Sequence, residues 1–168
     1  MKQTTVIMSK LKVWIIVLNQ TTQNQFTHAG KYIPSLEGLR YLITDFNLLK
    51  TADVLATANL LGTFHRVIDR GHRRSNDPTF LASVGRNLGI SRRQKCVYFD
   101  TLPGAIVTAQ LQGWNGCLLA PKSSLRVSEY KTHRSGDHRA GRGLWYNSRF
   151  SNLGKAVMHY LFGRTSQE

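Results

Sequence analysis

The hydrophobic residues of this chain fall into short runs that are separated by longer polar stretches. Residues 13–18 are apolar and rich in β-branched side chains, which is typical of either a strand or a buried turn of helix. Residues 39–43 predict a strand that ends at Thr44 and Asp45. Residues 19–31 lie between these runs and are rich in Gln, Thr and Asn, so we expect them to form a loop.

The clearest helical pattern of the chain follows the second apolar run. Asp45 or Asn47 can cap its first turn, and Gly62 occupies a position at which helices commonly end. The apolar residues that recur at helical spacing are Leu48, Leu49, Ala52, Leu55, Ala56 and Leu60. A strand, a short turn and a helix in this order predict the first unit of a β-α-β fold.

A second unit of the same kind lies further along the chain. Residues 95–100 are apolar on both faces, as expected of a buried parallel strand. Pro103 suits the first turn of a helix, which we expect to continue over residues 105–112. Residues 113–116 then predict a tight turn, and residues 117–120 predict a third short strand.

The remaining segments are more polar. Residues 63–94 carry few apolar side chains and predict a basic insertion that faces solvent or a partner, with a short helix at 79–88. Residues 122–149 predict a basic, Gly-rich loop. Residues 151–162 predict a last amphipathic helix, capped by Ser151 or Asn152.

These patterns predict an α/β fold, a partial doubly wound parallel sheet with basic loop insertions and a C-terminal helix. We expect three parts: a basic N-terminal arm over residues 1–25, an α/β domain over residues 26–127, and a basic loop with the C-terminal helix over residues 128–168.

The charge of the chain points to a class of partner. There are 23 Lys and Arg residues against 9 Asp and Glu, which gives a net charge of +14 and a pI near 10.4. Hydrophobic residues make up 41% of the chain, which is enough for a core and too much for a disordered polycation. A positively charged surface favours binding to a polyanion. Nucleic acid is such a partner, because neutralising each phosphate releases counterions.

Two Arg-dense patches contain the candidate RNA-binding residues. Arginine predominates over lysine in both, which suits bidentate contacts to phosphate and stacking on bases. The candidates are Arg66, Arg70, Arg73, Arg74, Arg92, Arg93, Lys95, Lys122, Arg126, Lys131, Arg134, Arg139, Arg142 and Arg149. Tyr130, Trp145 and Tyr146 interleave with the second patch, where they either stack on unpaired bases or pack onto their own domain.

Sequence motifs of catalysis are absent. No glycine-rich phosphate-binding motif, no paired metal ligands and no nucleophilic serine motif occur, so we expect no cofactor and no metal. Asp45 and Asp100 each end a predicted strand, where doubly wound enzymes often place acids, but we favour capping of the following helix or turn. His133, Asp137 and His138 share one basic loop, where phosphate contact or solvation is favoured over a general-base or metal role.

Cys96 and Cys117 each lie in an apolar run and are interpreted as small buried residues rather than as a disulfide or metal ligands. No stretch approaches ~20 apolar residues, so no membrane span is expected. Residues 1–36 contain no acid and share part of the bias of organelle transit peptides, although they lack arginine.

An ordered series of short segments runs through the first two thirds of the chain. It comprises His28-Ala29-Gly30, Tyr32-Ile33, Gly38, the predicted strand 39–43, Asp45, Lys50-Thr51, the helix to Leu61, residues 94–101 and residues 113–121. In order and spacing these segments resemble the bacterial-type small-subunit ribosomal protein two, in a diverged and shortened organellar form. The later half of that family has no room here, because only 47 residues follow Pro121 (168 minus 121).

The resemblance implies a structural constituent of the small subunit of a mitochondrial ribosome, which acts in translation as part of a ribonucleoprotein. Its partners would be ribosomal RNA and neighbouring ribosomal proteins, with no small-molecule substrate and no enzymatic activity, and it would lie in the mitochondrion. Two alternatives stay open. One is a non-catalytic accessory subunit of another large mitochondrial complex, and the other is an RNA-processing factor that uses His133, Asp137 and His138.

Overall fold

The computed structural model describes residues 11–71, 77–120 and 149–163. Within these ranges the chain forms a six-stranded sheet in the order β3-β2-β1-β4-β5-β6, and every neighbouring pair is parallel. The strands are β1 (Val13–Leu18), β2 (Leu39–Thr44), β3 (Arg66–Asp69), β4 (Cys96–Asp100), β5 (Asn115–Leu119) and β6 (Arg149–Phe150). The predicted α/β class with a doubly wound parallel sheet is confirmed.

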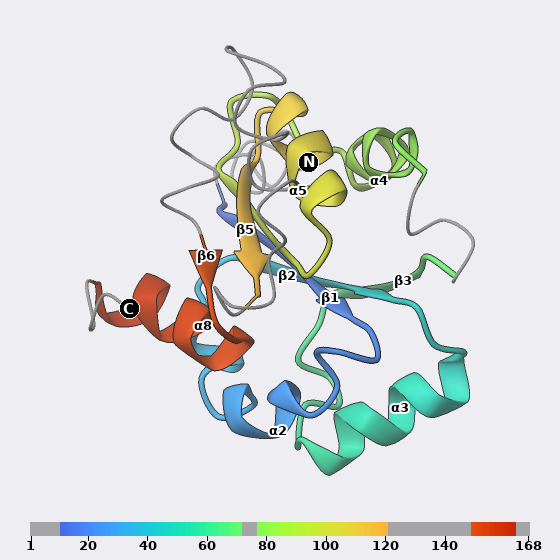
Figure 1. Cartoon of the computed structure of the whole chain (residues 1–168), viewed down its shortest axis with the longest axis vertical. Helices are drawn as coiled ribbons and strands as arrows, with labels where there is room; N and C mark the ends of the chain where they lie inside the picture. The colour runs from blue at the N-terminus through green and yellow to red at the C-terminus, as the bar shows by residue number, and fades with distance from the viewer. Residues whose placement is uncertain (1–10, 72–76, 121–148, 164–168) are drawn as a thin grey trace, which may run out of the picture.

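Helices cover both faces of this sheet (Figure 1). One face carries α4 (Phe80–Leu88) and α5 (Pro103–Leu111). The other carries α2 (Gln25–Ala29), α3 (Leu48–Thr57) and α8 (Leu153–Phe162), with a short 3-10 turn at Ile33–Ser35. The chain first builds outward from β1 through β2 to β3, and then returns to place β4 on the other side of β1. This reversal is what puts the later crossover helices on the opposite face.

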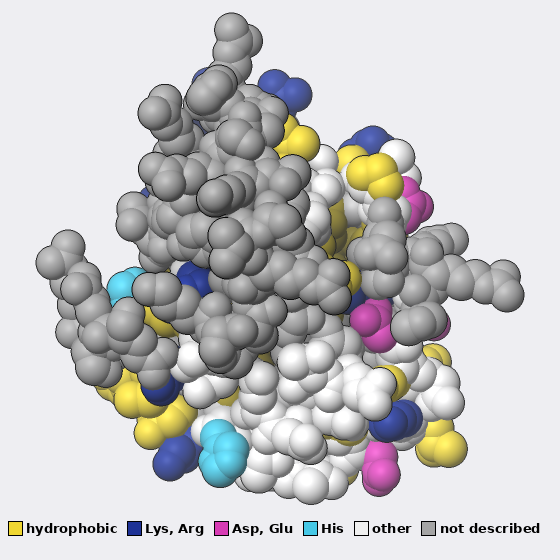
Figure 2. Space-filling model, in the orientation of Figure 1, with side chains coloured by type: hydrophobic (Ala, Val, Ile, Leu, Met, Phe, Trp, Pro, Cys, Tyr) yellow, Lys and Arg dark blue, Asp and Glu magenta, His cyan; other side chains and the backbone are white. Residues whose placement is uncertain are grey.

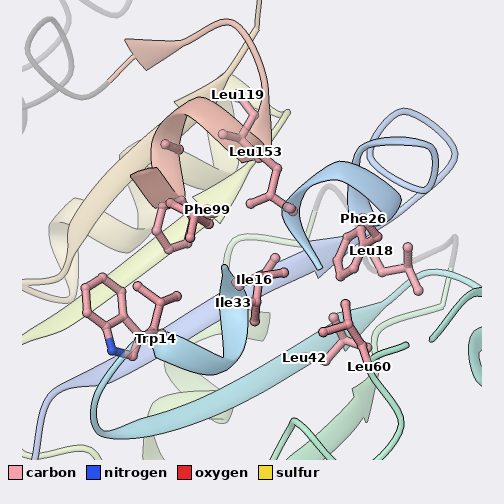
Figure 3. Packing of buried hydrophobic residues seen from close by; sticks show 14 of the residues in the cluster. Trp14, Ile16, Leu18, Phe26, Ile33, Leu42, Leu60, Phe99, Leu119 and Leu153 are labelled. Atoms are coloured by element: carbon pink, nitrogen blue, oxygen red, sulfur yellow. The ribbon is translucent and has the colours of Figure 1, made fainter. Parts of the chain in front are cut away.

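The central strand β1 is buried along its whole length and divides the core in two. Trp14, Ile16 and Leu18 point into the cluster drawn in Figure 3, where Phe26 and Phe99 pack beside them. The intervening residues of β1 point into a second cluster beneath α4 and α5. A run that is apolar on both faces suits the middle of a parallel sheet, so the ambiguous segment 13–18 is a strand.

Most predicted elements agree with the structure, and the differences concern short ones. The strands at 39–43 and 95–100, the helix at 79–88, the proline-started helix and the C-terminal helix are confirmed. Four elements were not predicted: α2 lies within the expected loop 19–31, the 3-10 turn lies at Ile33–Ser35, β3 lies within the segment 63–94, and β6 has only two residues. All four are too short for a hydrophobic period to define them.

The helix α3 is shorter than predicted and turned about its axis. It ends at Thr57 rather than near Gly62, because Ala58 caps it and Asn59 takes the left-handed conformation with φ of 58°. Leu48 and Leu49, expected on the buried face, are 68% and 83% exposed. The buried residues of α3 are Leu55, which was predicted on the apolar face, and Thr51, which was not.

Cys96 and Cys117 are buried and free, as predicted. In the part of the chain that the structure describes, no helix combines the length and the hydrophobicity that crossing a membrane requires. The proposed boundaries near residues 25 and 127 and the mitochondrial location stay predictions.

Candidate active site at the carboxyl edge of the sheet

The carboxyl ends of the parallel strands bring several loops together at one edge of the sheet. From this edge β1 leads to α2 on one face, and its neighbour β4 leads to α5 on the other. The crevice at such a change of direction is where open α/β sheets bind ligands. Asn19 follows β1 and Thr101 follows β4, and Asn19 Nδ2 donates to Thr101 Oγ1 over 3.0 Å. The two loops therefore meet at the point where a ligand is expected.

Asn19 organises the loop that leaves the central strand. Its Oδ1 accepts hydrogen bonds from the backbone N–H groups of Thr21 and Thr22 at 2.9 and 3.0 Å. Thr22 Oγ1 accepts from the Asn19 N–H and donates to the Val17 carbonyl, each over 2.9 Å. A side chain that bonds to the backbone two residues ahead makes an Asx turn. A neutral amide supplies hydrogen bonds rather than a nucleophile or a base, so Asn19 can position a ligand but not attack it.

A buried arginine joins two carboxylates at the same edge. Arg70 follows β3, and its Nε and Nη2 donate to Asp45 Oδ1 and Oδ2 at 2.7 and 2.9 Å. Arg70 Nη1 donates to Asp100 Oδ2 at 2.9 Å. The hydroxyl of Tyr98 donates to the same Asp100 oxygen at 2.5 Å. The side chains of Arg70 and Asp100 are 1% and 0% exposed, whereas that of Asp45 is 14% exposed. Asp45 is thus the carboxylate of this group that reaches solvent.

The surroundings fix the protonation of two members of this group. Burial alone would lower the pKa of Arg70, but its hydrogen bonds to Asp45 and the charge of Asp100 outweigh burial and raise the pKa. Burial raises the pKa of Tyr98, and the neighbouring charge of Asp100 raises it further. Near neutral pH, Arg70 therefore stays a cation and Tyr98 stays a hydroxyl donor.

The two acids at the strand ends have different local roles. Asp100 Oδ1 accepts from the N–H groups of Thr101 and Leu102 at 2.6 and 3.4 Å, so it caps the turn before α5 as predicted. Asp45 does not cap α3. Asn47 Oδ1 takes that role by accepting from the Lys50 N–H at 2.8 Å. The two side-chain oxygens of Asp45 bind Arg70 instead of capping the helix.

A pair of threonines supports the end of β2. Thr44 Oγ1 and Thr51 Oγ1 lie 2.8 Å apart, and Thr51 Oγ1 donates to the Asn47 carbonyl over 2.8 Å. Thr44 therefore donates to Thr51 and accepts from the Phe46 N–H at 3.1 Å. This chain of bonds ties the first turn of α3 to the strand and holds Asp45 between them.

The predicted RNA-binding residues are not gathered at this site. Arg70 is buried and paired with Asp45 and Asp100, so it does not present its charge to a polyanion. The exposed members are Arg66 on β3 and the group just before β4, namely Arg92, Arg93 and Lys95. Arg149 is half-buried and donates to the Ala120 carbonyl at 2.9 Å. On the face shown in Figure 2 the described Lys and Arg side chains are dispersed.

The other predicted residues lie outside the described ranges. They are Arg73, Arg74, Lys122, Arg126, Lys131, Arg134, Arg139 and Arg142, together with Tyr130, Trp145, Tyr146, His133, Asp137 and His138. RNA binding by these residues and by the exposed arginines stays a prediction.

The sequence marked only part of this site. Asp45 and Asp100 were recognised as acids at strand ends, but their link through Arg70 was not predicted. The sequence feature that could have marked Asn19 as a site residue is its position directly after a buried strand, in a segment that we interpreted as a loop. Among the described residues, no group of three or more His, Cys, Asp or Glu is arranged to hold a metal ion. A guanidinium occupies the position between the two carboxylates instead.

Comparison with known proteins yields likenesses of fold. No family model matches the sequence, and no curated protein matches it. A dehalogenase solved with an intermediate complex has a TM-score of 0.53 at 11% identity, over 83% of this chain and 54% of that chain. The L-2-haloacid dehalogenase from Xanthobacter autotrophicus has a TM-score of 0.50 at 14% identity, over 84% of this chain and 60% of that chain. The same dehalogenase with chloropropionic acid covalently bound has a TM-score of 0.50 at 13% identity, over 81% and 60%.

These matches show that the chain has the α/β fold of the haloacid dehalogenases. They also show that the chain spans a little more than half the length of those enzymes, at 54% and 60% of their chains.

The same matches correct the functional expectations. The resemblance to small-subunit ribosomal protein two is wrong, because the similar solved structures are dehalogenases and no ribosomal protein family matches. The expected role as a structural constituent of a ribosome, bound to ribosomal RNA and ribosomal proteins, is contradicted with it. The expectations of no enzymatic activity and of no small-molecule substrate are contradicted too, since these similar solved structures are dehalogenases, which are enzymes that act on small molecules. The segments that carried the resemblance are the ordinary strand and turn patterns of an α/β sheet.

Proposed function

We propose that this chain is a hydrolase that acts on a small anionic molecule in the crevice between the loops after β1 and β4. The observation that carries the proposal is the convergence of Asp45, Arg70 and Asp100 beside Asn19 at the point where the sheet changes direction. That point is the expected ligand site of the fold. The fold is shared with enzymes that are named as dehalogenases.

The residues of the site suit direct attack by water. Asp45 is the group's partly exposed carboxylate, so it can take a proton from a water molecule. Arg70 holds both Asp45 oxygens and so fixes the direction in which the carboxylate faces. In the reaction, the water oxygen bonds to the substrate, the leaving group departs with its electron pair, and the water proton passes to Asp45.

A covalent route is less suited to these residues. One dehalogenase of the same fold is described with chloropropionic acid covalently bound, and such an adduct requires a nucleophilic side chain. In this chain the residue directly after the central strand is Asn19, and its side-chain amide is not a nucleophile. Asp100 is fully buried, and its oxygens are occupied by Arg70, Tyr98 and the following backbone. The Thr101 hydroxyl, which accepts from Asn19 and keeps its own proton to donate, is assigned to bind the substrate, and Asn19 holds it in place.

The test is hydrolysis of a panel of 2-haloacids, including 2-chloropropionic acid, and of simple phosphate monoesters by the full chain. Release of chloride or phosphate is measured. Asp45→Asn is expected to lower kcat by about 100-fold or more, because it removes the general base. Asp53→Asn, which changes an exposed acid on α3, is the matched control and should leave kcat unchanged. Absence of turnover on every substrate, or full activity of the Asp45→Asn protein, would contradict the proposal.

A further inference from the structure

A second concave surface lies at the opposite edge of the sheet. It is a groove of about 530 Å³ between α4 and α5, which pack side by side on one face (Figure 1). Its floor is formed where the chain leaves each helix and enters the next strand, through Ile90 before β4 and Trp114 before β5. A volume of this size is within the range of sites for small organic ligands. The groove shares no residue with the carboxyl-edge site.

One side of the groove is positively charged. Arg86 on α4 and Arg92 before β4 both line it, and both are exposed. None of its described lining residues is acidic, and the ion pairs found among the described residues all involve Arg70. Two arginines that line one groove suit the binding of phosphate oxygens, because each guanidinium offers a planar fork of donors.

The other side of the groove is apolar. Leu111 is 63% exposed at the end of α5, and Ile90, in the floor between the two arginines in sequence, is half-buried. Trp114 forms part of the floor, because Gly85 leaves room for its ring. A Cβ at Gly85 would lie 3.1 Å from Trp114 Cζ2. A large apolar side chain left open to water next to paired cations suits a ligand with an apolar body and an anionic end.

We propose that this groove binds a small organic phosphate with a flat apolar body, of the class of the mononucleotides. The phosphate groups bind Arg86 and Arg92, and the body of the ligand covers Leu111 and Ile90. This is a binding site separate from the proposed hydrolytic site, and it requires no chemistry at the carboxyl edge.

Binding is tested by titrating the full chain with ADP in a calorimeter, with inorganic phosphate and adenosine as partial probes. ADP is expected to bind more tightly than either partial probe, because only ADP occupies both sides of the groove. Arg86→Gln/Arg92→Gln should weaken ADP binding by roughly tenfold or more. Leu111→Ser should weaken ADP binding and leave phosphate binding unchanged.

The control protein loses two positive charges, as the Arg86→Gln/Arg92→Gln protein does, but at positions outside the groove. Arg66→Gln/Lys31→Gln neutralises two exposed cations outside the groove and should change ADP affinity by less than about twofold. The proposal is overturned if ADP does not bind, or if both double variants lose affinity equally, which would indicate the general charge of the surface. It is also overturned if inorganic phosphate binds as tightly as ADP.

Discussion

Arg70 is the residue on which the carboxyl edge depends most. Its guanidinium is the partner of one fully buried carboxylate, Asp100, and of one partly exposed carboxylate, Asp45. A buried ion pair adds little to stability compared with apolar residues, but loss of one partner leaves the other charge buried and unpaired.

Replacement of Arg70 by Ala is therefore expected to lower the free energy of unfolding by about 3–5 kcal/mol. Urea denaturation followed by circular dichroism measures this change. Arg66→Ala, on the exposed side of β3, is the control and should stay within about 0.5 kcal/mol of the unmodified protein. A loss below about 1 kcal/mol for Arg70→Ala would show that Asp100 finds another partner.

Gln110 on α5 is a buried polar residue whose hydrogen bonding differs from that of Arg70. It is 8% exposed, and neither its Oε1 nor its Nε2 has a hydrogen-bond partner among the described residues. A buried amide without partners destabilises the folded state, because it gives up its bonds to water.

Gln110→Met keeps the length of the side chain and removes both polar atoms. We expect it to raise the free energy of unfolding by about 1 kcal/mol in thermal or urea denaturation. Gln20→Met, at an exposed position after β1, should give no such gain. A destabilised Gln110→Met protein would mean that the amide has a partner in solution.

At the scale of elements, close approach of a helix to its strand decides where small residues are required. Gly116 in β5 faces α5, and a Cβ added there would lie 2.7 Å from Ile106 Cγ2 and 3.1 Å from the Ile106 carbonyl oxygen. Gly104, in the first turn of α5, would direct a Cβ into open space.

Two alanine substitutions should therefore have opposite effects. Gly116→Ala is expected to lower the free energy of unfolding by about 1–3 kcal/mol, because α5 must move away from the sheet. Gly104→Ala is expected to raise it by about 0.5–1 kcal/mol, because alanine has less conformational freedom to lose in a helix. Equal effects of the two changes in denaturation experiments would disprove this account of the α5–β5 contact.

The strands and helices differ in how well they could be predicted from the sequence. The strands β1, β2 and β4 are evident from their apolar runs, because burial on both faces leaves few polar positions in them. The exposed edge strand β3 has no such run. The burial of Leu48 and Leu49 was predicted wrongly, because Thr51 turns inward to bond with Thr44 and no hydrophobic period reveals a polar contact of that kind.

The candidate site was harder to predict than the fold. Arg70 is 25 residues from Asp45 and 30 residues from Asp100 in the sequence, and only the order of the strands brings them together. The order depends on which strand pairs with β1 after the chain returns across the sheet. Residues 63–94 were predicted as a basic insertion with a short helix and no strand. The excess of arginine favoured RNA binding for Arg70 as well, although Arg70 is the buried arginine among the described residues.

For the molecule as a whole, several buried groups titrate only when the fold opens. Burial raises the pKa of Cys96 and Cys117 above the ordinary value of 9.0, and the pKa of Tyr98 and Tyr160 above 10.0. The unfolded chain therefore releases these protons at a lower pH than the folded chain does. Since the folded state then holds more protons, stability falls as pH rises above these ordinary values.

We expect the melting temperature to fall as pH rises above about 9. Lys12, whose pKa is lowered by burial and by Lys95, acts in the opposite direction but is a single, less buried group. Scanning calorimetry from pH 8 to pH 11 measures the trend. Cys96→Val/Cys117→Val removes the two groups with the lower ordinary pKa and should shift the onset of the fall toward pH 10. A melting temperature that rises over this range would contradict the assignment.

The central position of β1 has a consequence for how the chain folds. β1 is made before β4, one of its two neighbours in the sheet, which lies about 80 residues further along the chain. At a synthesis rate of about 5–20 residues per second, β1 remains unpaired on its β4 side for roughly 4–16 seconds before β4 is made. During that time it can pair with another nascent chain. Efficient production of this protein should therefore depend on chaperones that shield an unpaired strand, and on low concentrations during refolding.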